Sequence, residues 1–245
     1  PERIARAKAE PLELRPSSQV HFAPHLADLF RRHPQQGPLK TSINADLQRF
    51  AESLVSCELA RLNEHEAHHA AVLVVHNPSG EILALVGSGN HKNQIDGQLN
   101  GVFTKRSPGS TMKPFLYAHA FELGLSWPGH ILPDVPHSFR SSDGVAAPNN
   151  YDLSFHGPVS VRQALACSLN VAALHQLNEI GGAQSWMPFL ESLGFALHQP
   201  ASHYGLGLAI GNAEVPLIQL TQAYQILANQ GIRRDLTLEL QAPTS

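Results

Sequence analysis

The sequence predicts an α+β fold in which an antiparallel sheet has helices on both faces. Three observations carry this prediction: four stretches have apolar residues at helical spacing, two short runs rich in Val, Ile and Leu flank a turn, and polar or glycine-rich segments separate these elements. Of the 245 residues, 42% are hydrophobic and only 15% are charged. This composition favours a folded chain with a substantial core over a disordered one.

The first half of the chain contains five predicted elements. Residues 1–38 hold six prolines among scattered charges, which indicates an extended connector and not a packed element, with a boundary near Pro38. The other four are a helix over about 44–67, two strands at 70–76 and 81–86 that form a hairpin, and a second helix that starts at Ser110 after a glycine-rich loop and ends at Gly124.

The second half is predicted to be mainly helical. A proline- and serine-rich segment at 126–158 precedes a helical region at 161–180, which Gly181 and Gly182 close. A further helix covers about 214–229. The alternation in 233–240 predicts a last strand that has no evident partner.

Composition excludes several classes of protein. The formal net charge is −3 and the basic residues are not clustered, so a nucleic-acid footprint is absent. The longest apolar run, Ala70 to Val75, has six residues, far short of the roughly 20 that a bilayer requires. Cys57 and Cys167 are isolated and match no zinc or redox spacing, which favours two ordinary buried thiols.

Ser110 and Lys113 are the strongest candidates for a nucleophile and its base. Residues three apart on a helix face the same side, so the Lys113 amine is expected beside the Ser110 hydroxyl. A serine becomes a good nucleophile only when a neighbour removes its proton, and a lysine can do this only with a lowered pKa. The positive end of the helix dipole disfavours an ammonium. Alone, Ser-x-x-Lys is common, and the simpler interpretation is an exposed, serine-capped helix start.

Ser168-Leu169-Asn170 strengthens this candidate. In a shared cleft, the Ser168 hydroxyl could pass a proton between lysine and leaving group, and the Asn170 amide could bind a substrate carbonyl or fix Lys113. The alternative is a polar pair within a helix that has no function. Ser-x-x-Lys followed by a motif of this kind is typical of penicillin-binding proteins and class A β-lactamases.

The sequence around these motifs resembles class A penicillin-binding proteins over residues 39–245, with details that point to the 1C subclass. Other similar segments are the hairpin 71–86 and residues 211–215. The strings that carry the resemblance are Arg106-Ser107-Pro108-Gly109-Ser110-Thr111-Met112-Lys113-Pro114-Phe115, Leu132-Pro133-Asp134, Phe155-His156-Gly157-Pro158-Val159-Ser160 and Ser168-Leu169-Asn170.

The resemblance implies a domain organisation. In this family a membrane anchor and a glycosyltransferase domain precede a D,D-transpeptidase domain. Residues 1–38 would then be the linker from an upstream glycosyltransferase domain, and 39–245 the N-terminal part of a transpeptidase domain at the periplasmic face of a bacterial inner membrane. The family's third motif, Lys-[Ser/Thr]-Gly, does not occur in the sequence. It is expected beyond Ser245, so the last strands of this penicillin-binding protein and serine β-lactamase-like fold would be missing and this chain by itself inactive.

The resemblance also implies a reaction. Ser110 would attack a D-Ala-D-Ala stem peptide of peptidoglycan and form an acyl-enzyme that an amine of a neighbouring stem resolves, which cross-links the cell wall. Lys113 would be the general base, Ser168 the proton shuttle and Asn170 the substrate-positioning amide. The expected partners are stem peptides and β-lactam antibiotics, without nucleic acid and with the membrane reached only through an N-terminal anchor. No metal or organic cofactor is implied.

Three alternatives remain open at this stage. A serine β-lactamase or D,D-carboxypeptidase would share the acylation step, although the class A β-lactamase box Glu-x-x-x-Asn does not occur after Ser168. A non-catalytic, wall-binding scaffold would form no adduct. His65-Glu66-Ala67-His68-His69 matches the zinc motif His-Glu-x-x-His, but it falls at the end of the first helix, where a solvated, histidine-rich helix end is the better interpretation.

Overall fold

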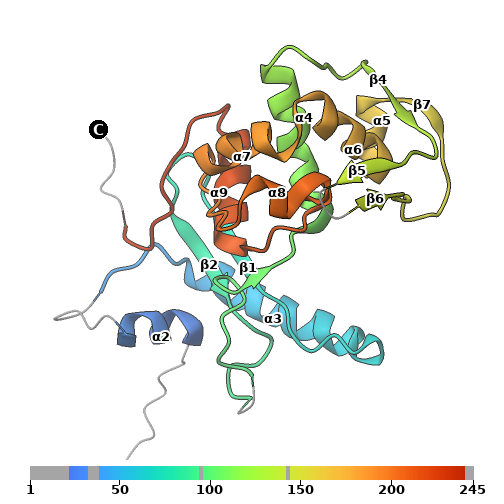
Figure 1. The fold of residues 1–245 in the computed structure, drawn as a ribbon. Helices are drawn as coiled ribbons and strands as arrows, with labels where there is room; N and C mark the ends of the chain where they lie inside the picture. Colours follow the sequence, from blue (N-terminus) through green and yellow to red (C-terminus); the bar gives the residue numbers. More distant parts are fainter. Residues whose placement is uncertain (1–21, 33–38, 94–95, 142–143, 241–245) are drawn as a thin grey trace, which may run out of the picture.

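The computed structural model describes residues 22–32, 39–93, 96–141 and 144–240 (Figure 1). Its strands are β1 (Val72–Val75), β2 (Ile82–Val86), β3 (Lys105–Arg106), β4 (Ile131–Asp134), β5 (Phe139–Ser141), β6 (Gly144–Ala146), β7 (Gly157–Ser160) and β8 (Val215–Pro216). Its α-helices are α2 (Pro24–Arg32), α3 (Ala45–Arg61), α4 (Lys113–Glu122), α5 (Val161–Ala166), α6 (Asn170–Glu179), α7 (Gly182–Ser192), α8 (Ala201–Tyr204) and α9 (Leu217–Ala228). The strands pair antiparallel as β1-β2, β3-β8, β4-β7 and β5-β6. This is the predicted α+β class.

The β1-β2 hairpin lies between two helices, as predicted. Its α3 face buries Ala84 and Val86 against Ala51 and Val55 of α3. Its opposite face packs Leu85 and its neighbours with the start of α9. Period-two alternation sends successive strand residues to opposite faces, so a hairpin that is apolar at nearly every position can be covered on both sides.

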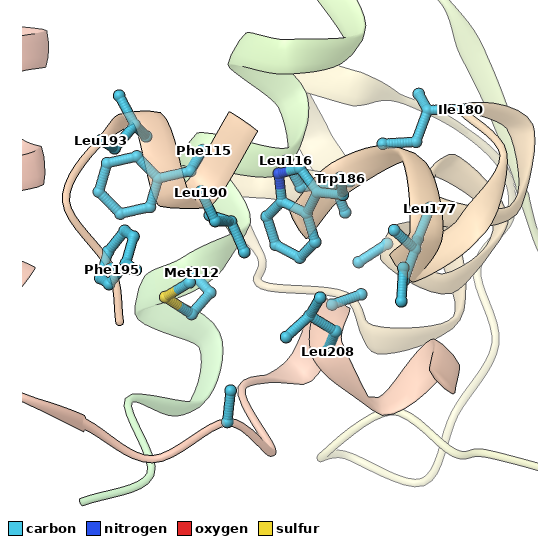
Figure 2. Close-up of a cluster of buried hydrophobic side chains, with 14 of the residues drawn as sticks. Met112, Phe115, Leu116, Leu177, Ile180, Trp186, Leu190, Leu193, Phe195 and Leu208 are labelled. Carbon is cyan, nitrogen blue, oxygen red and sulfur yellow. The ribbon is translucent and has the colours of Figure 1, made fainter. Parts of the chain in front are cut away.

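A second body of the fold is built from helices α4, α6, α7 and α9 with the 3₁₀ helix Gly205–Ile210. Its apolar cluster includes Met112, Phe115 and Trp186, all fully buried (Figure 2). The predicted region 161–180 contributes α6 to this cluster, and the predicted helix 214–229 contributes α9. Within the described residues, none of the helices is long and apolar enough to cross a membrane.

The expectation of an unpacked connector is wrong for residues 24–32, which form α2. Ala23 and Leu26 are buried, and the Ala23 backbone N–H donates to Glu52 Oε1 at 2.9 Å. The buried His25 ring lies 2.9 Å from the Gly97 carbonyl oxygen. Contacts with the side of the fold that contains α3 and β2 therefore stabilise α2, although the segment is rich in proline. Residues 1–21 and 33–38 of the predicted connector lie outside the described residues.

Three further elements differ from the sequence prediction. Segment 126–158 contains β4, β5 and β6, because β4 pairs with β7 across the intervening loop. Helix α7 follows α6 after only two residues, although the sequence analysis ended the helical region at Gly181 and Gly182 and predicted no helix after them; Pro188 in the interior of α7 weakens its helical signal. Residues 233–240 do not form the predicted strand, yet they have partners: Ile82 N–H donates to the Thr237 carbonyl and Ser42 N–H to the Leu238 carbonyl, both at 2.8 Å.

Candidate active site

Ser110 lies in a 3₁₀ turn, Gly109–Met112, that continues directly into α4; we call these four residues the Ser110 turn. This confirms the predicted position of Ser110 at the start of a helix. Ser110 is exposed, whereas Met112 and Lys113 are fully buried. The turn therefore presents the serine hydroxyl outward while its apolar side is fixed in the core.

Two distant segments support the Ser110 turn. Ser107 Oγ donates to the Gly211 carbonyl at 2.6 Å, and the Tyr224 hydroxyl donates to the Thr111 carbonyl at 2.8 Å. Gly211 has φ +80°, and a Cβ there would lie 2.3 Å from the Gly109 carbonyl oxygen. Only glycine permits both this conformation and this approach of two backbones. The position of Ser110 thus depends on the chain about a hundred residues later, which a local motif does not reveal.

Lys113 is fully buried and reaches the second motif. Its Nζ donates to the Ser168 carbonyl at 2.5 Å, to Ser168 Oγ at 3.2 Å and to Asn170 Oδ1 at 2.8 Å. Burial lowers the pKa of Lys113 to about 8. The three oxygens stabilise the ammonium, while burial makes the neutral amine accessible near neutral pH. Within the described residues no hydrogen bond joins Nζ to the Ser110 hydroxyl, so Lys113 is hydrogen-bonded to the second motif and not to the serine three residues before it.

Ser168 does not lie inside a continuous helix. The predicted helical region breaks between α5 and α6, with Ser168 at φ +54° and Asn170 as the first residue of α6. The left-handed conformation of a non-glycine residue is uncommon and strained. It turns the chain so that both the carbonyl and the hydroxyl of Ser168 face Lys113. The break between α5 and α6 therefore allows Ser168 to contact Lys113 through both groups, which a residue in the middle of one helix could not do.

One cavity of about 580 Å³ brings the predicted residues together. Ser110, Ser168 and Asn170 line it, and the Lys113 ammonium contacts the latter two from behind. The candidate nucleophile, a second hydroxyl, an amide and an amine of lowered pKa thus converge on one cavity. Such a set can move a proton between a serine and a substrate.

Sequence reasoning missed the polar network that holds α6 in place. The fully buried Asp134 carboxylate accepts from Asn150 Nδ2 at 2.8 and 2.9 Å. Asn150 Oδ1 accepts from the Asn170 N–H at 2.8 Å and the Val171 N–H at 3.3 Å, so it satisfies the first turn of α6. Asp134 and His156 occurred only within the strings that carry the resemblance, and no periodicity marks Asn150.

The prediction of two buried thiols is wrong. Cys57 and Cys167 are free, but both are exposed, and Cys167 lines the cavity.

The zinc-like motif lies at the end of a helical stretch. That stretch ends at His65, the backbone of Glu66 is left-handed, and His69 pairs with Asp96 at 2.8 Å. No group of three or more His, Cys, Asp or Glu side chains in the described part of the chain could hold a metal ion.

Comparison with known proteins defines the class to which this fold and site belong. The family model described as the penicillin binding protein transpeptidase domain matches residues 70–242. The chain therefore belongs to the penicillin-binding-protein transpeptidase family. Penicillin-binding protein 1C of Escherichia coli is 31% identical over 244 residues, which is 99% of this chain and 31% of that protein. Penicillin-binding protein 1A of Aquifex aeolicus is 35% identical over 62% of this chain and 20% of its own length.

Solved structures agree on the fold. The crystal structure of penicillin-binding protein 1A from Haemophilus influenzae matches 71% of this chain and 25% of its own, with a TM-score of 0.63 and 25% identity. PonA1 from Mycobacterium tuberculosis in complex with penicillin V matches 88% of this chain and 58% of its own, with a TM-score of 0.68 and 22% identity. The chain spans about a third or less of the two curated relatives described above.

Proposed function

We propose that the protein containing this chain is a peptidoglycan D,D-transpeptidase that works through an acyl-enzyme on Ser110. The observation that carries the proposal is the buried Lys113 amine, held by Ser168 and Asn170 at the cavity that Ser110 lines. Family membership supports a role in wall synthesis and the binding of β-lactams. By the same likeness, the site would act on the periplasmic face of a bacterial inner membrane.

In the acylation step, Ser110 Oγ bonds to the carbonyl carbon of the penultimate D-Ala of a stem peptide. For this transfer the Ser110 hydroxyl must first form a hydrogen bond with Lys113 Nζ, whose present partners are Ser168 and Asn170. Neutral Lys113 then takes up the Ser110 proton, and its pKa of about 8 leaves a useful fraction of neutral amine at pH 7. The peptide C–N bond breaks, and Lys113 returns the proton through Ser168 to the departing D-Ala amine. Lys113 ends the step neutral, and an ester joins the donor peptide to Ser110.

The second step transfers the acyl group to an amine. A neutral amine of a neighbouring stem attacks the ester carbonyl, an amide forms, and the ester C–O bond to Ser110 breaks. The proton that the amine loses passes by way of Lys113 and Ser168 to Ser110 Oγ. Asn170 keeps Lys113 in place through Oδ1, while its Nδ2 donates to the Asn149 carbonyl at 3.1 Å. Its expected contact with a substrate carbonyl would require Nδ2 to exchange that partner.

The intact mass of the full-length protein that contains this chain, after incubation with benzylpenicillin, tests this proposal. We expect a long-lived adduct of one penicillin per protein, lost in Ser110→Ala and retained in Ser53→Ala, a control serine on the exposed side of α3. Rapid release with continued penicillin hydrolysis would instead identify a β-lactamase. An adduct that persists in Ser110→Ala, or none in the unmodified protein, would overturn the proposal.

A further inference from the structure

The cavity has a second wall that the reaction above does not use, the loop Asn150–His156. Both ends of this loop are tied to the buried Asp134 carboxylate. Asn150 Nδ2 donates to Asp134 Oδ1 at 2.8 Å, and the His156 backbone N–H donates to Asp134 Oδ2 at 2.9 Å. The His156 ring adds a contact of 2.8 Å through Nδ1. A loop fixed at both ends keeps the backbone of its central residues in a defined position.

The centre of the loop turns apolar and anionic groups outward. Tyr151 is 100% exposed and lines the same cavity as Ser110. Leu153 is 77% exposed and has φ +58°, a strained conformation that the anchors at either end maintain. An exposed aromatic ring on a constrained loop at a cavity is a feature of binding surfaces, since a rigid ring provides contact area at low entropic cost.

Asp152, next to Tyr151, gives this wall a negative charge. Its carboxylate accepts from Ser154 Oγ at 2.6 Å and from the Ser154 N–H at 3.2 Å. These bonds lower the pKa of Asp152, so the group is ionised at neutral pH. Its side chain is half exposed, and the partner that the structure gives it besides Ser154 is the His156 ring, whose Nε2 lies 3.4 Å away.

No free cation offsets this charge among the described residues that line the cavity. They include neither lysine nor arginine. Lys113 lies behind them, and its ammonium hydrogens are directed to Ser168 and Asn170. A carboxylate that faces solvent beside an aromatic ring complements a ligand with an ammonium group and an aliphatic stem, because the ring covers the stem and also attracts the cation.

We propose that Tyr151 and Asp152 form a subsite for the ammonium of an amine-bearing peptide, and that this peptide is the acyl acceptor. The inference rests on the proposed function and deepens it by naming the chemistry of the second substrate. The subsite captures the acceptor as its ammonium, which releases one proton to solvent before the neutral nitrogen attacks the ester. The donor peptide could also carry an ammonium group, so the experiment measures the KM of the donor and the KM of the acceptor separately.

The test uses the intact protein and its Asp152→Asn variant, which keeps the size of the side chain and removes its charge. Three quantities are measured: the rate of acylation by benzylpenicillin, the KM of a thioester acyl donor, and the KM of two acceptors. One acceptor is a tripeptide with a single free lysine amine, and the other is methoxyamine, which is uncharged at neutral pH. Asp235→Asn is the matched control, since Asp235 is also an exposed carboxylate and pairs only with Arg233 in the described structure.

We expect Asp152→Asn to raise the KM of the tripeptide about fivefold, as the loss of a partly exposed charge pair allows. Penicillin acylation, the donor KM and transfer to methoxyamine stay within about twofold, and Asp152→Glu restores most of the acceptor affinity. Tyr151→Ala also raises the KM of the tripeptide. An unchanged tripeptide KM, or a change in the donor KM instead, overturns the inference. Absence of penicillin acylation in the unmodified protein overturns the proposed function itself, and the inference with it.

Discussion

The Ser110 turn and the Asn150–His156 loop form two walls of one cavity, but different forces hold them in place. Behind the Ser110 turn, Met112 and Phe115 are fully buried in an apolar cluster that contains Trp186. Behind the loop lies one carboxylate, Asp134, which accepts hydrogen bonds from both loop ends. Apolar burial positions a segment through shape and area, whereas hydrogen bonds position it through direction. The first wall therefore depends on many contacts and the second on a single side chain.

The largest expected effect comes from breaking the apolar wall. Trp186→Ala leaves a cavity in the apolar cluster that also contains Met112 of the Ser110 turn, and it should lower the free energy of unfolding by about 3–5 kcal/mol. Chemical denaturation measures this loss. Trp186→Phe is the matched control: the Trp186 Nε1 is buried without a partner within the described residues, so phenylalanine forfeits area but no hydrogen bond. Equal losses in the two variants would show that cavity formation is not the cause.

Breaking the polar wall should cost less stability. Asp134→Asn replaces one acceptor by an NH₂ group that faces the donors of Asn150 and His156, and we expect a loss of about 1–3 kcal/mol. Thermal or chemical denaturation is again the measurement. Asp152→Asn, in the same loop but exposed, should stay within about 0.5 kcal/mol. If the Asp134→Asn and Asp152→Asn variants lose the same free energy of unfolding, Asp134 does not anchor the loop.

The last prediction concerns Lys113, which follows the Ser110 turn directly and binds Ser168 and Asn170, and it tests a rate and not stability. In the proposed mechanism acylation requires the neutral Lys113 amine, so the acylation rate is expected to rise as Lys113 loses its proton. With a pKa of about 8, the rate of penicillin acylation should increase about tenfold per pH unit below that value and level off above it. Rates measured from about pH 6 to pH 10 test this. A midpoint near the ordinary lysine value of 10.5 would contradict a base made available by burial.

The parts of the molecule that sequence predicted well are those with a periodic apolar pattern. The hairpin, α3, α4 and α9 each follow from such a pattern together with a cap or turn signal, for example Asn44 at the start of α3. The Ser-x-x-Lys motif also placed Ser110 correctly at a helix start. Local spacing determines these features, and one sequence is enough to show them.

What the sequence did not show depends on contacts between distant segments. The contact of Lys113 with Ser168, and not with Ser110, follows from a helix break that no glycine or proline announces. The packing of α2 and the pairing of β4 with β7 likewise involve residues far apart in the chain. The anchor at Asp134 is a single buried polar group, and periodicity contains no information about such groups.

Ser168 shows how stability and chemistry can oppose each other at one position. Its left-handed backbone at φ +54° costs about 1–2 kcal/mol in a residue with a Cβ, and glycine would avoid that cost. Glycine, however, would remove the hydroxyl that lies 3.2 Å from Lys113 Nζ. Engineering for thermal stability alone would therefore favour Ser168→Gly and in the same change remove the proposed proton carrier. A library screened for melting temperature should enrich that substitution, and one screened for penicillin acylation should reject it.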